Sequence, residues 1–322
     1  MLPYATGAEA EEALGRTLTY AEAAWLRYSA SVPDRWLHLH SVAMTMVVYT
    51  LAPLPLALLE LRTPAAAAPY KLQPRARHSL AVFLRCYVES VRVSLLLLGP
   101  CLLVSYTDTK IMEMPTGLPL PSMGEVAAQL AVYFLVEDYI NYWIHRLLHT
   151  KWCYDKIHSV HHEFTAPMGY AVWYDHWAEK LLLSVASLAG PAIVPCHITT
   201  LWLWFVARLL VGINIHSGFK LPFGLAKFIP FYGGAEQHDY HHYVGGQSQS
   251  NFAPVFTYCD YIYGTDKRAA EEEQRRQVEE QRRQAKEGKR ENENVEMNER
   301  LLCNLKAVEM MSLLLLLLKT VV

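Results

Sequence analysis

The chain has 322 residues, of which 52% are hydrophobic, and its 29 basic and 31 acidic side chains give a formal net charge of −2. Neither this balance nor any basic patch argues for a nucleic-acid partner. The six cysteines are scattered without paired spacing, which excludes a disulfide framework and predicts reduced, mostly buried thiols. Residues 1–40 lack a basic segment followed by an apolar core, so we expect no signal peptide.

We expect residues 1–40 to be cytosolic or interfacial, and apolar stretches follow at about 41–61, 79–106, 124–144 and 181–215. The first matches the roughly 20 residues that cross a bilayer, although Pro53 and Pro55 interrupt it. The last contains Pro191 and Pro195 and is better interpreted as two closely spaced spans or a re-entrant hairpin. Because several such stretches are hard to bury without lipid, the sequence favours an all-α, polytopic membrane bundle over a soluble helical protein. We expect about four or five membrane-embedded helices.

Histidines are concentrated in one region: eleven of the fourteen lie between His145 and His242. Eight of them form three clusters, which are His145 and His149; His158, His161 and His162; and His238, His241 and His242. Residues three or four apart share a helix face, so we expect each cluster to aim its imidazoles in one direction. Imidazole is the commonest metal ligand, and eight rings exceed the about four to six ligands of one ion. The clusters therefore predict two metals.

Other histidines differ in their surroundings. His176 and His216 lie where the chain should re-enter the cytosolic layer, and we expect them to be the next ligands. His197 follows Pro195 in the middle of an apolar stretch, so we expect it to cap the hairpin turn. Nothing marks the three histidines before the clusters as ligands.

Charge around the clusters predicts their side of the membrane. The stretch at 124–144 runs directly into His145 and is followed by Arg146, Lys151 and Lys156, so the positive-inside rule places the first two clusters in the cytosol. The third cluster reaches the same side only if the stretch at 181–215 crosses the membrane an even number of times. A shared site requires that even number.

Polar residues beside the clusters are candidate partners of the imidazoles. Glu137 and Asn141 precede His145 and His149 at four-residue spacing, so all four form one helical stripe. We expect this carboxylate and amide to accept imidazole N–H groups, which fixes the tautomer of a metal-binding histidine. The alternative is a polar stripe that faces another helix. Four other acidic residues near the clusters could also accept imidazole N–H groups, but their spacing gives this role less geometric support: Glu163, Asp175, Glu179 and Asp239.

Three boxes and their flanking residues carry a family resemblance. They read EDYINYWIHRLLH at 137–149, KIHSVHHEFTAP at 156–167 and FYGGAEQHDYHH at 231–242, and NFAPVFTYCDYIYGTD follows at 251–266. In this order, between hydrophobic segments, they resemble the fatty acid hydroxylase superfamily of membrane di-iron enzymes. The resemblance is closer to its plant sterol C-4 methyl oxidase-like members and covers roughly residues 1–266. It makes 41–123 the N-terminal membrane helices and 124–266 the catalytic region with its membrane hairpin.

The resemblance implies a chemistry and a place in the cell. Two iron ions would use O2 to attack a C–H bond of a lipid, in this branch a sterol C-4 methyl group. The chain has no dinucleotide fingerprint and no haem attachment motif, so electrons from NAD(P)H should arrive through a separate carrier such as cytochrome b5 with its reductase. The implied location is the endoplasmic reticulum membrane, with the histidine-rich di-metal cap in the cytosol.

Other functions remain open. The same superfamily contains Glossy/Eceriferum-type very-long-chain aldehyde decarbonylases, which make alkanes for wax and share the three boxes. We expect this chain to lack their additional C-terminal domain, which favours the sterol hypothesis. A fatty acyl hydroxylase or a membrane desaturase ranks third, because desaturases place more chain between the second and third boxes. A metal transporter would distribute its ligands at membrane depth, whereas these clusters lie in polar segments.

The tail departs from the family. Residues 267–300 are rich in Glu, Arg, Lys and Gln with opposite charges at i,i+4 spacing, which predicts a solvated helix or partial disorder for the tail, 267–322. The leucine run at 313–318 is too short to span a bilayer. We expect the tail to be dispensable for the metal site.

Overall fold

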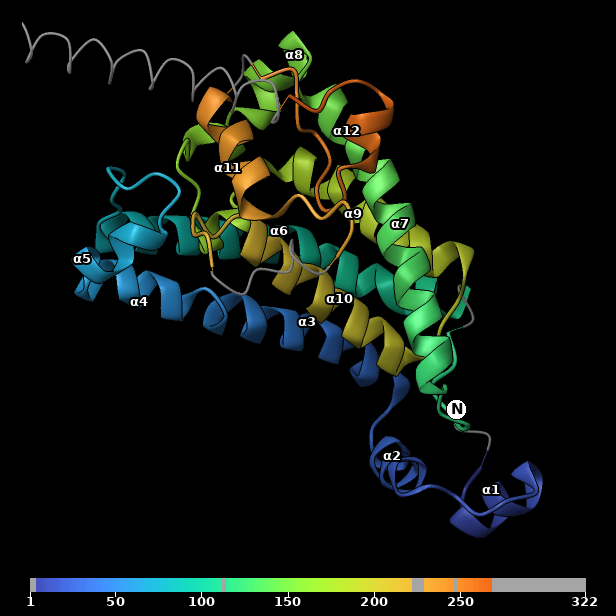
Figure 1. Cartoon of the computed structure of the whole chain (residues 1–322). Coiled ribbons are helices and arrows are strands. Elements are labelled where there is room, and N and C mark those ends of the chain that lie inside the picture. Colours follow the sequence, from blue (N-terminus) through green and yellow to red (C-terminus); the bar gives the residue numbers. More distant parts are fainter. Residues whose placement is uncertain (1–3, 112–113, 222–228, 246–247, 268–322) are drawn as a thin grey trace, which may run out of the picture. The chain divides into compact units, whose positions relative to one another are not determined.

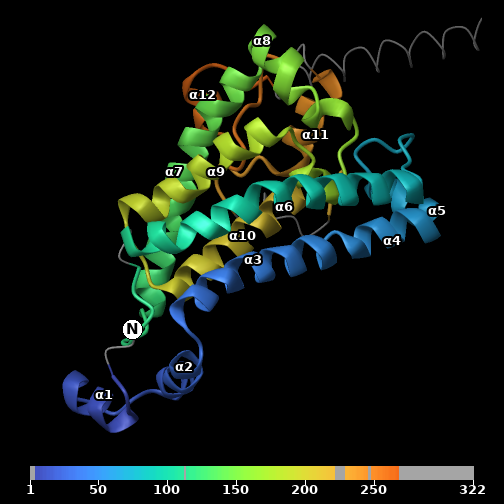
Figure 2. The same ribbon diagram turned by 180° about the vertical axis from the view of Figure 1, so that it is seen from behind.

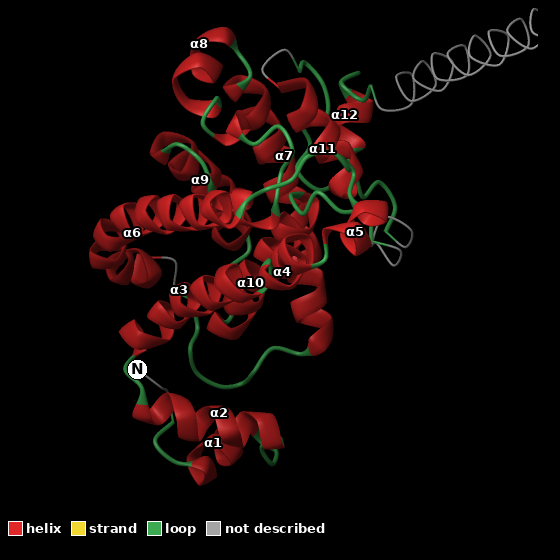
Figure 3. Cartoon of the chain, turned by 90° about the vertical axis from the view of Figure 1, so that its left-hand side faces the viewer, coloured by secondary structure: helices red, strands yellow, loops and turns green. Residues whose placement is uncertain are grey.

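The computed structural model describes residues 4–111, 114–221, 229–245 and 248–267. These residues form helices and loops and contain no named strand, which confirms the all-α prediction (Figure 3). In chain order the helices are α1 (Gly7–Leu14), α2 (Tyr20–Ser31), α3 (Asp34–Leu51), α4 (Leu54–Arg62), α5 (Pro64–Ala67), η1 (Ala68–Tyr70), α6 (Leu80–Ile111), α7 (Met123–Leu148), α8 (Lys151–Cys153), η2 (Tyr154–His158), η3 (His161–Glu163), η4 (Gly169–Trp173), α9 (Trp177–Ile193), α10 (Ile198–Ile215), α11 (Gly234–Val244) and α12 (Tyr258–Ile262).

Local signals in the sequence set where the long helices begin and end. Helix α7 starts with a capping box, in which the Ser122 hydroxyl accepts the N–H of Glu125 and the Glu125 carboxylate accepts the N–H of Ser122. The break between α3 and α4 falls at Pro53, because a proline inside a helix removes a backbone donor and clashes with the preceding turn. The predicted hairpin at 181–215 is divided into α9 and α10, and the His197 side chain caps α10 by accepting the N–H of Thr199.

The long helices pack in pairs. Helix α3 packs along α10, and α9 packs along α7 (Figures 1 and 2). At Gly190 of α9, an added Cβ would lie 2.9 Å from the Cα of Tyr133, so only glycine permits this close approach of α9 to α7. The core beside this contact includes the fully buried Tyr133 and Trp204, whose rings meet edge to face.

The elements that carry the histidine clusters gather at one end of α7. Figure 1 shows α8, α11 and α12 together beyond that end, and Figure 2 shows the same grouping from behind. Helix α10 contacts α11, and the π-helical turn η2 contacts both α7 and α9. The chain between the second and third clusters thus runs out along α9 and back along α10, so all three clusters meet at one place, as the shared-site hypothesis requires.

Two helical segments in the described part of the chain are long and apolar enough to cross a membrane. The first is Asp34–Arg62, which is α3 and α4 taken together, and the second is α10. Helix α7 covers the predicted stretch at 124–144 but carries three acidic residues, Glu125, Glu137 and Asp138, and α9 has only 17 residues. By length and composition, the described residues therefore contain fewer candidate membrane spans than the four or five embedded helices expected from the sequence.

Residues Met1–Asp266 form one compact unit, and the unit that begins at Lys267 comprises the tail. Our expectations for the tail lie outside the described residues. The site described next is contained wholly in the first unit.

Candidate metal centre

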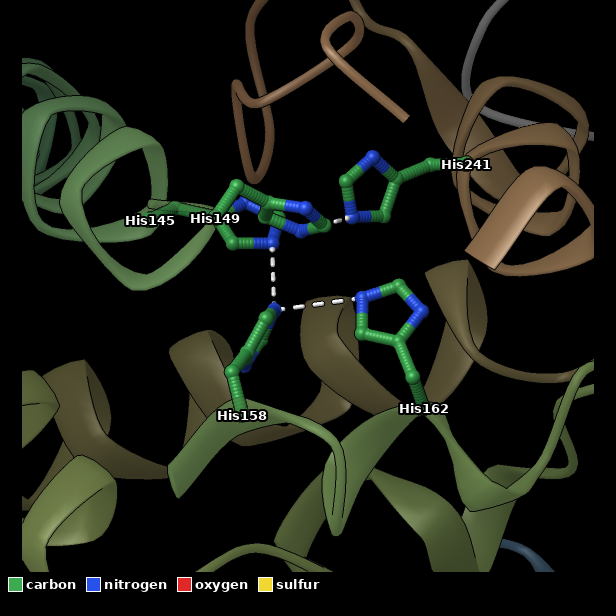
Figure 4. A group of neighbouring side chains, drawn as sticks. All are labelled: His145, His149, His158, His162 and His241. Carbon is green, nitrogen blue, oxygen red and sulfur yellow. Dashed lines mark hydrogen bonds between the residues drawn. The ribbon is translucent and has the colours of Figure 1, made fainter. Parts of the chain in front are cut away.

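Nine buried histidines form two groups, each with ligand nitrogens within 4.8 Å of one another. The five-histidine group comprises His145, His149, His158, His162 and His241, and the four-histidine group comprises His161, His216, His238 and His242. None of the nine residues is more than 7% exposed. Figure 4 shows the rings of the five-histidine group pointing toward one another from the end of α7, from α11 and from the turns η2 and η3. All eight clustered histidines are present, together with His216.

The division between the groups follows helical spacing and corrects one expectation. Residues four apart stay together, as in His158 with His162 and His238 with His242. Their neighbours His161 and His241 each belong to the opposite group, because adjacent residues on a helical turn point in different directions. The second and third clusters therefore do not aim all their imidazoles one way. Each of them supplies both groups.

The second cluster also departs from a regular α-helix. His158 ends the π-helical turn η2, and His161 begins the 3-10 turn η3. Single turns of the π type are rare and occur frequently at functional sites. Here the change from a wide to a tight turn brings His158 and His162 within 3.1 Å, measured between their Nε2 atoms.

Facing nitrogen lone pairs show that the site fits metal ions. Nδ1 of His145 donates to the carbonyl oxygen of Phe252, so Nε2 of this neutral ring carries no proton. Nδ1 of His158 donates to Glu179 when that carboxylate is ionised, which leaves Nε2 of His158 without a proton as well. Those two Nε2 atoms are nevertheless only 3.1 Å apart. A cation resolves the repulsion of the two lone pairs, and metal–nitrogen bonds of about 2.1 Å at right angles place two ligands about 3.0 Å apart.

The four-histidine group has the same arrangement. His161 donates Nδ1–H to the carbonyl oxygen of Tyr174, and His216 donates to that of Gly212. Their deprotonated Nε2 atoms lie 3.3 Å apart, and Nε2 of His238 lies 2.9 Å from that of His216. An all-imidazole donor set of this kind suits iron, copper, nickel or zinc.

Burial keeps the imidazoles in the neutral form that metals bind. Burial lowers the pKa of His145 and of His161 to about 4. Burial, followed by the nearby His145 and His161, lowers the pKa of His149 to about 2. The same causes depress the pKa of the other six, as expected where desolvation disfavours the charged ring. No proton has to leave before a metal binds at neutral pH.

The oxygen partners of the imidazoles differ from those expected. Glu137 accepts from Asn141 at 3.0 Å and pairs with Arg208 of α10 at 2.8 Å, and within the described residues neither Glu137 nor Asn141 bonds to a histidine. The stripe therefore faces another helix, which is the alternative reading of this pattern. The carboxylate that contacts an imidazole is Glu179, whose Oε1 lies 2.8 Å from Nδ1 of His158.

Backbone carbonyls hold most of the other rings. Apart from the contacts of His145, His161 and His216, His241 donates to the carbonyl oxygen of Ser250 and His242 to that of Phe164. Sequence reasoning could not find these partners, since every residue type has a carbonyl group. The only hint of these partners in the sequence was two acidic residues that hold the backbone near Phe252. Asp138 accepts the N–H of Val255, and Asp260 accepts the N–H of Phe252.

The remaining sequence candidates lie around the groups. His176 belongs to neither group and instead caps α9, where its Nδ1 accepts the N–H of Ala178. Glu163 pairs with Arg85 and Asp175 with Lys180, while Asp239 accepts from Gln73 at 3.2 Å. A cavity of about 400 Å³ opens beside Asp175 and His176, and its lining is mixed: charged Arg85, Glu89 and Arg92 lie there together with Val93, Val160 and Trp177.

Comparison with known proteins adds to this geometry. The sequence model of the fatty acid hydroxylase family matches residues 130–265, which contain all nine histidines. Very-long-chain aldehyde decarbonylase GL1-10 of Oryza sativa subsp. japonica is 64% identical over 267 residues, which cover 83% of this chain and 89% of that protein. Methylsterol monooxygenases 1-1 and 1-2 of Arabidopsis thaliana are 54% and 53% identical over 269 residues, which cover 83% of this chain and 90% of each relative. No solved structure matches the chain.

Proposed function

The chain belongs to the fatty acid hydroxylase family, and on that premise we propose that this membrane oxidoreductase is a C-4 methylsterol monooxygenase of sterol biosynthesis. The observation that carries the oxygenase assignment is the pair of buried all-histidine groups. The sterol assignment draws on similarity to methylsterol monooxygenases along nine-tenths of their length.

The histidines would hold one iron in each group. With iron bound, the centre would supply O2 reduction and oxidation of an unactivated C–H bond, carried stepwise at the C-4 methyl group to a carboxylic acid. The residues contribute a fixed ligand set and a dry environment: each ring is at most 7% exposed. The Nδ1 contacts of His145 and His216 keep Nε2 free of protons and oriented toward the centre.

Electrons would come from NAD(P)H through a separate carrier, with cytochrome b5 and its reductase as the proposed partners. The proposed location is the endoplasmic reticulum membrane, with the histidine groups in the cytosol. The basic residues in the last turn of α7 and just beyond it, which are Arg146, Lys151 and Lys156, support that orientation through the positive-inside rule.

A second candidate function is very-long-chain aldehyde decarbonylation to an alkane. It is favoured by the 64% identity to a protein that carries the name aldehyde decarbonylase. The aligned length and coverage of this relative and of the methylsterol monooxygenases are nearly equal, so chain length does not separate the two candidates. Both substrates are apolar lipids, and the same histidine groups would serve both reactions.

Complementation of a yeast strain that lacks its own sterol C-4 methyl oxidase tests the proposal. We expect the chain to restore growth and C-4 demethylated sterols, and the His241→Ala variant to restore neither at equal membrane abundance. Alkanes are measured in the same cells after feeding with a long-chain aldehyde. Alkane formation without sterol demethylation would transfer the assignment to the second candidate. Purified protein should also consume O2 in an NAD(P)H- and lipid-dependent manner once a reductase system is added.

A further inference from the structure

One contact distinguishes the two histidine groups chemically. In the described part of the chain, six of the nine rings donate Nδ1–H to an oxygen partner, and five of those oxygens are backbone carbonyls. The sixth is the carboxylate of Glu179, which receives the proton of His158 in the five-histidine group. A carboxylate partner makes an imidazole more basic and more electron-donating than a neutral carbonyl partner does.

The carboxylate is buried where its charge acts strongly. Glu179 is 1% exposed at the start of α9, and its second oxygen has no hydrogen-bond partner among the described residues. At such low exposure, solvent screens the charge of Glu179 poorly, so it acts on a nearby ion more strongly than a surface charge would.

Among the described residues, Glu179 forms an ion pair with no lysine or arginine, and its partner is His158. Lys180, the basic residue next to it, pairs with the buried Asp175 at 2.8 Å. The other buried carboxylate near the ligands, Glu137, is paired with Arg208. Burial raises the pKa of the Glu179 carboxyl in the metal-free protein. A metal ion in the five-histidine group would favour the ionised carboxylate beside His158, because the cation balances its negative charge.

The four-histidine group has no comparable partner. His161, His216 and His242 donate to backbone carbonyls, and Nδ1 of His238 has no partner among the described residues. Its ligand field is therefore neutral throughout.

We propose that Glu179 is a positioning residue that makes the two metal positions inequivalent, by lowering the reduction potential of the iron in the five-histidine group. The negative charge stabilises Fe³⁺ more than Fe²⁺, so the one-electron reduction of that iron becomes less favourable. With both irons bound, the four-histidine group would therefore hold the iron that is easier to reduce, and the first electron from the carrier would go to that group. This role rests on the proposed function, since it requires two irons.

The experiment uses the full-length protein, purified in detergent and loaded with Mössbauer-active iron. Spectra recorded at a series of poised potentials report the reduction of each iron separately, and the His216→Ala variant identifies which signal belongs to the five-histidine group. In the wild type we expect two separate potentials. In Glu179→Gln, which keeps an oxygen acceptor but removes the charge, we expect the lower potential alone to rise. The ratio of reduced to oxidised iron should increase about tenfold at the wild-type midpoint, a shift of about 59 mV for one electron.

Glu163→Gln is the matched control. Glu163 directly follows His162 in the sequence, but its side chain is 41% exposed and contacts Arg85 and Tyr174 instead of an imidazole. We expect it to leave both potentials unchanged. An equal shift in this control, or an equal shift of both irons in Glu179→Gln, overturns the proposal. The proposal is also overturned if the two irons of the wild type share one reduction potential, whether or not Glu179→Gln retains iron. A wild type that binds fewer than two irons counts against the proposed function instead.

Discussion

The imidazole of His145 donates its Nδ1–H to the carbonyl oxygen of Phe252 at 2.7 Å, across 107 residues of sequence. This bond connects the end of α7 to the segment that follows the third histidine cluster. The same segment receives the Nδ1–H of His241 at the carbonyl oxygen of Ser250. Two rings of the five-histidine group therefore depend on how this one segment is held.

Asp260 holds the segment, and its replacement should release a metal. Its buried carboxylate accepts the N–H groups of Phe252 and Ala253 at 2.9 and 3.0 Å, and the Thr265 hydroxyl at 2.8 Å. In Asp260→Asn an amide group would face these donors, so we expect a loss of about 1–3 kcal/mol in stability. Iron should be lost from the five-histidine group first. Thermal unfolding and iron analysis measure the two effects.

Asp155→Asn is the control for Asp260. Asp155 is 53% exposed and pairs with Lys151 one helical turn away, an arrangement that contributes little to stability. We expect its iron content and melting temperature to equal those of the wild type. Unchanged iron in Asp260→Asn would show that the segment does not need this carboxylate to hold the rings.

His216 and His176 looked alike in the sequence, but their substitution should have opposite effects. His216 lies within the four-histidine group, so His216→Ala should remove one of two irons and abolish turnover. His176→Ala should keep both irons and lose only the cap of α9, at a cost of about 0.5–2 kcal/mol. Iron per chain, measured on protein extracted from membranes at equal yield, separates the two. Retention of both irons in His216→Ala would contradict the grouping.

The sequence predicts the ligands well because helical spacing is a local property. His145 and His149, like His238 and His242, reach the same group because four residues make nearly one helical turn. The partition of His161 and His241 into opposite groups depends on the local turn type around η3 and on how α11 packs. Neither can be read from the spacing of the boxes alone.

The oxygen partners show the limit of the sequence pattern more clearly. Glu137 has the better helical register with the ligands, yet it forms an ion pair with Arg208, which lies 71 residues away and outside the histidine clusters. Glu179 has no helical register with His158, and only the packing of α9 against η2 brings the two together. A tertiary ion pair thus decides which of two carboxylates reaches an imidazole.

The metal-free protein should lose stability as the pH falls below about 6.5. The folded protein depresses the pKa of His145 and of His161 to about 4, so the unfolded chain takes up protons first. The free energy of unfolding then decreases between about pH 6.5 and pH 4, by roughly 1.4 kcal/mol per pH unit for each such histidine. Bound metal also requires the neutral ring, so the iron-loaded protein should show this loss at lower pH. Melting temperatures of chelator-treated and loaded protein, measured from pH 7.5 to about 4, test this. Equal stability of the metal-free protein at the two ends would contradict it.

Deletion of residues 270–322 should leave the metal centre intact. The match to the family model ends at residue 265, and the last contacts that stabilise the site segment include those of Thr265 with Asp260 and with Tyr142. We expect the shortened protein to bind iron and to support turnover as the full chain does. A second truncation that begins at residue 251 removes the carbonyl partner of His145 together with Asp260, and it should lose iron. Iron per chain and turnover, compared between the two truncations in the same detergent, separate these expectations. Loss of iron in the shorter deletion would assign the tail a role in holding the site.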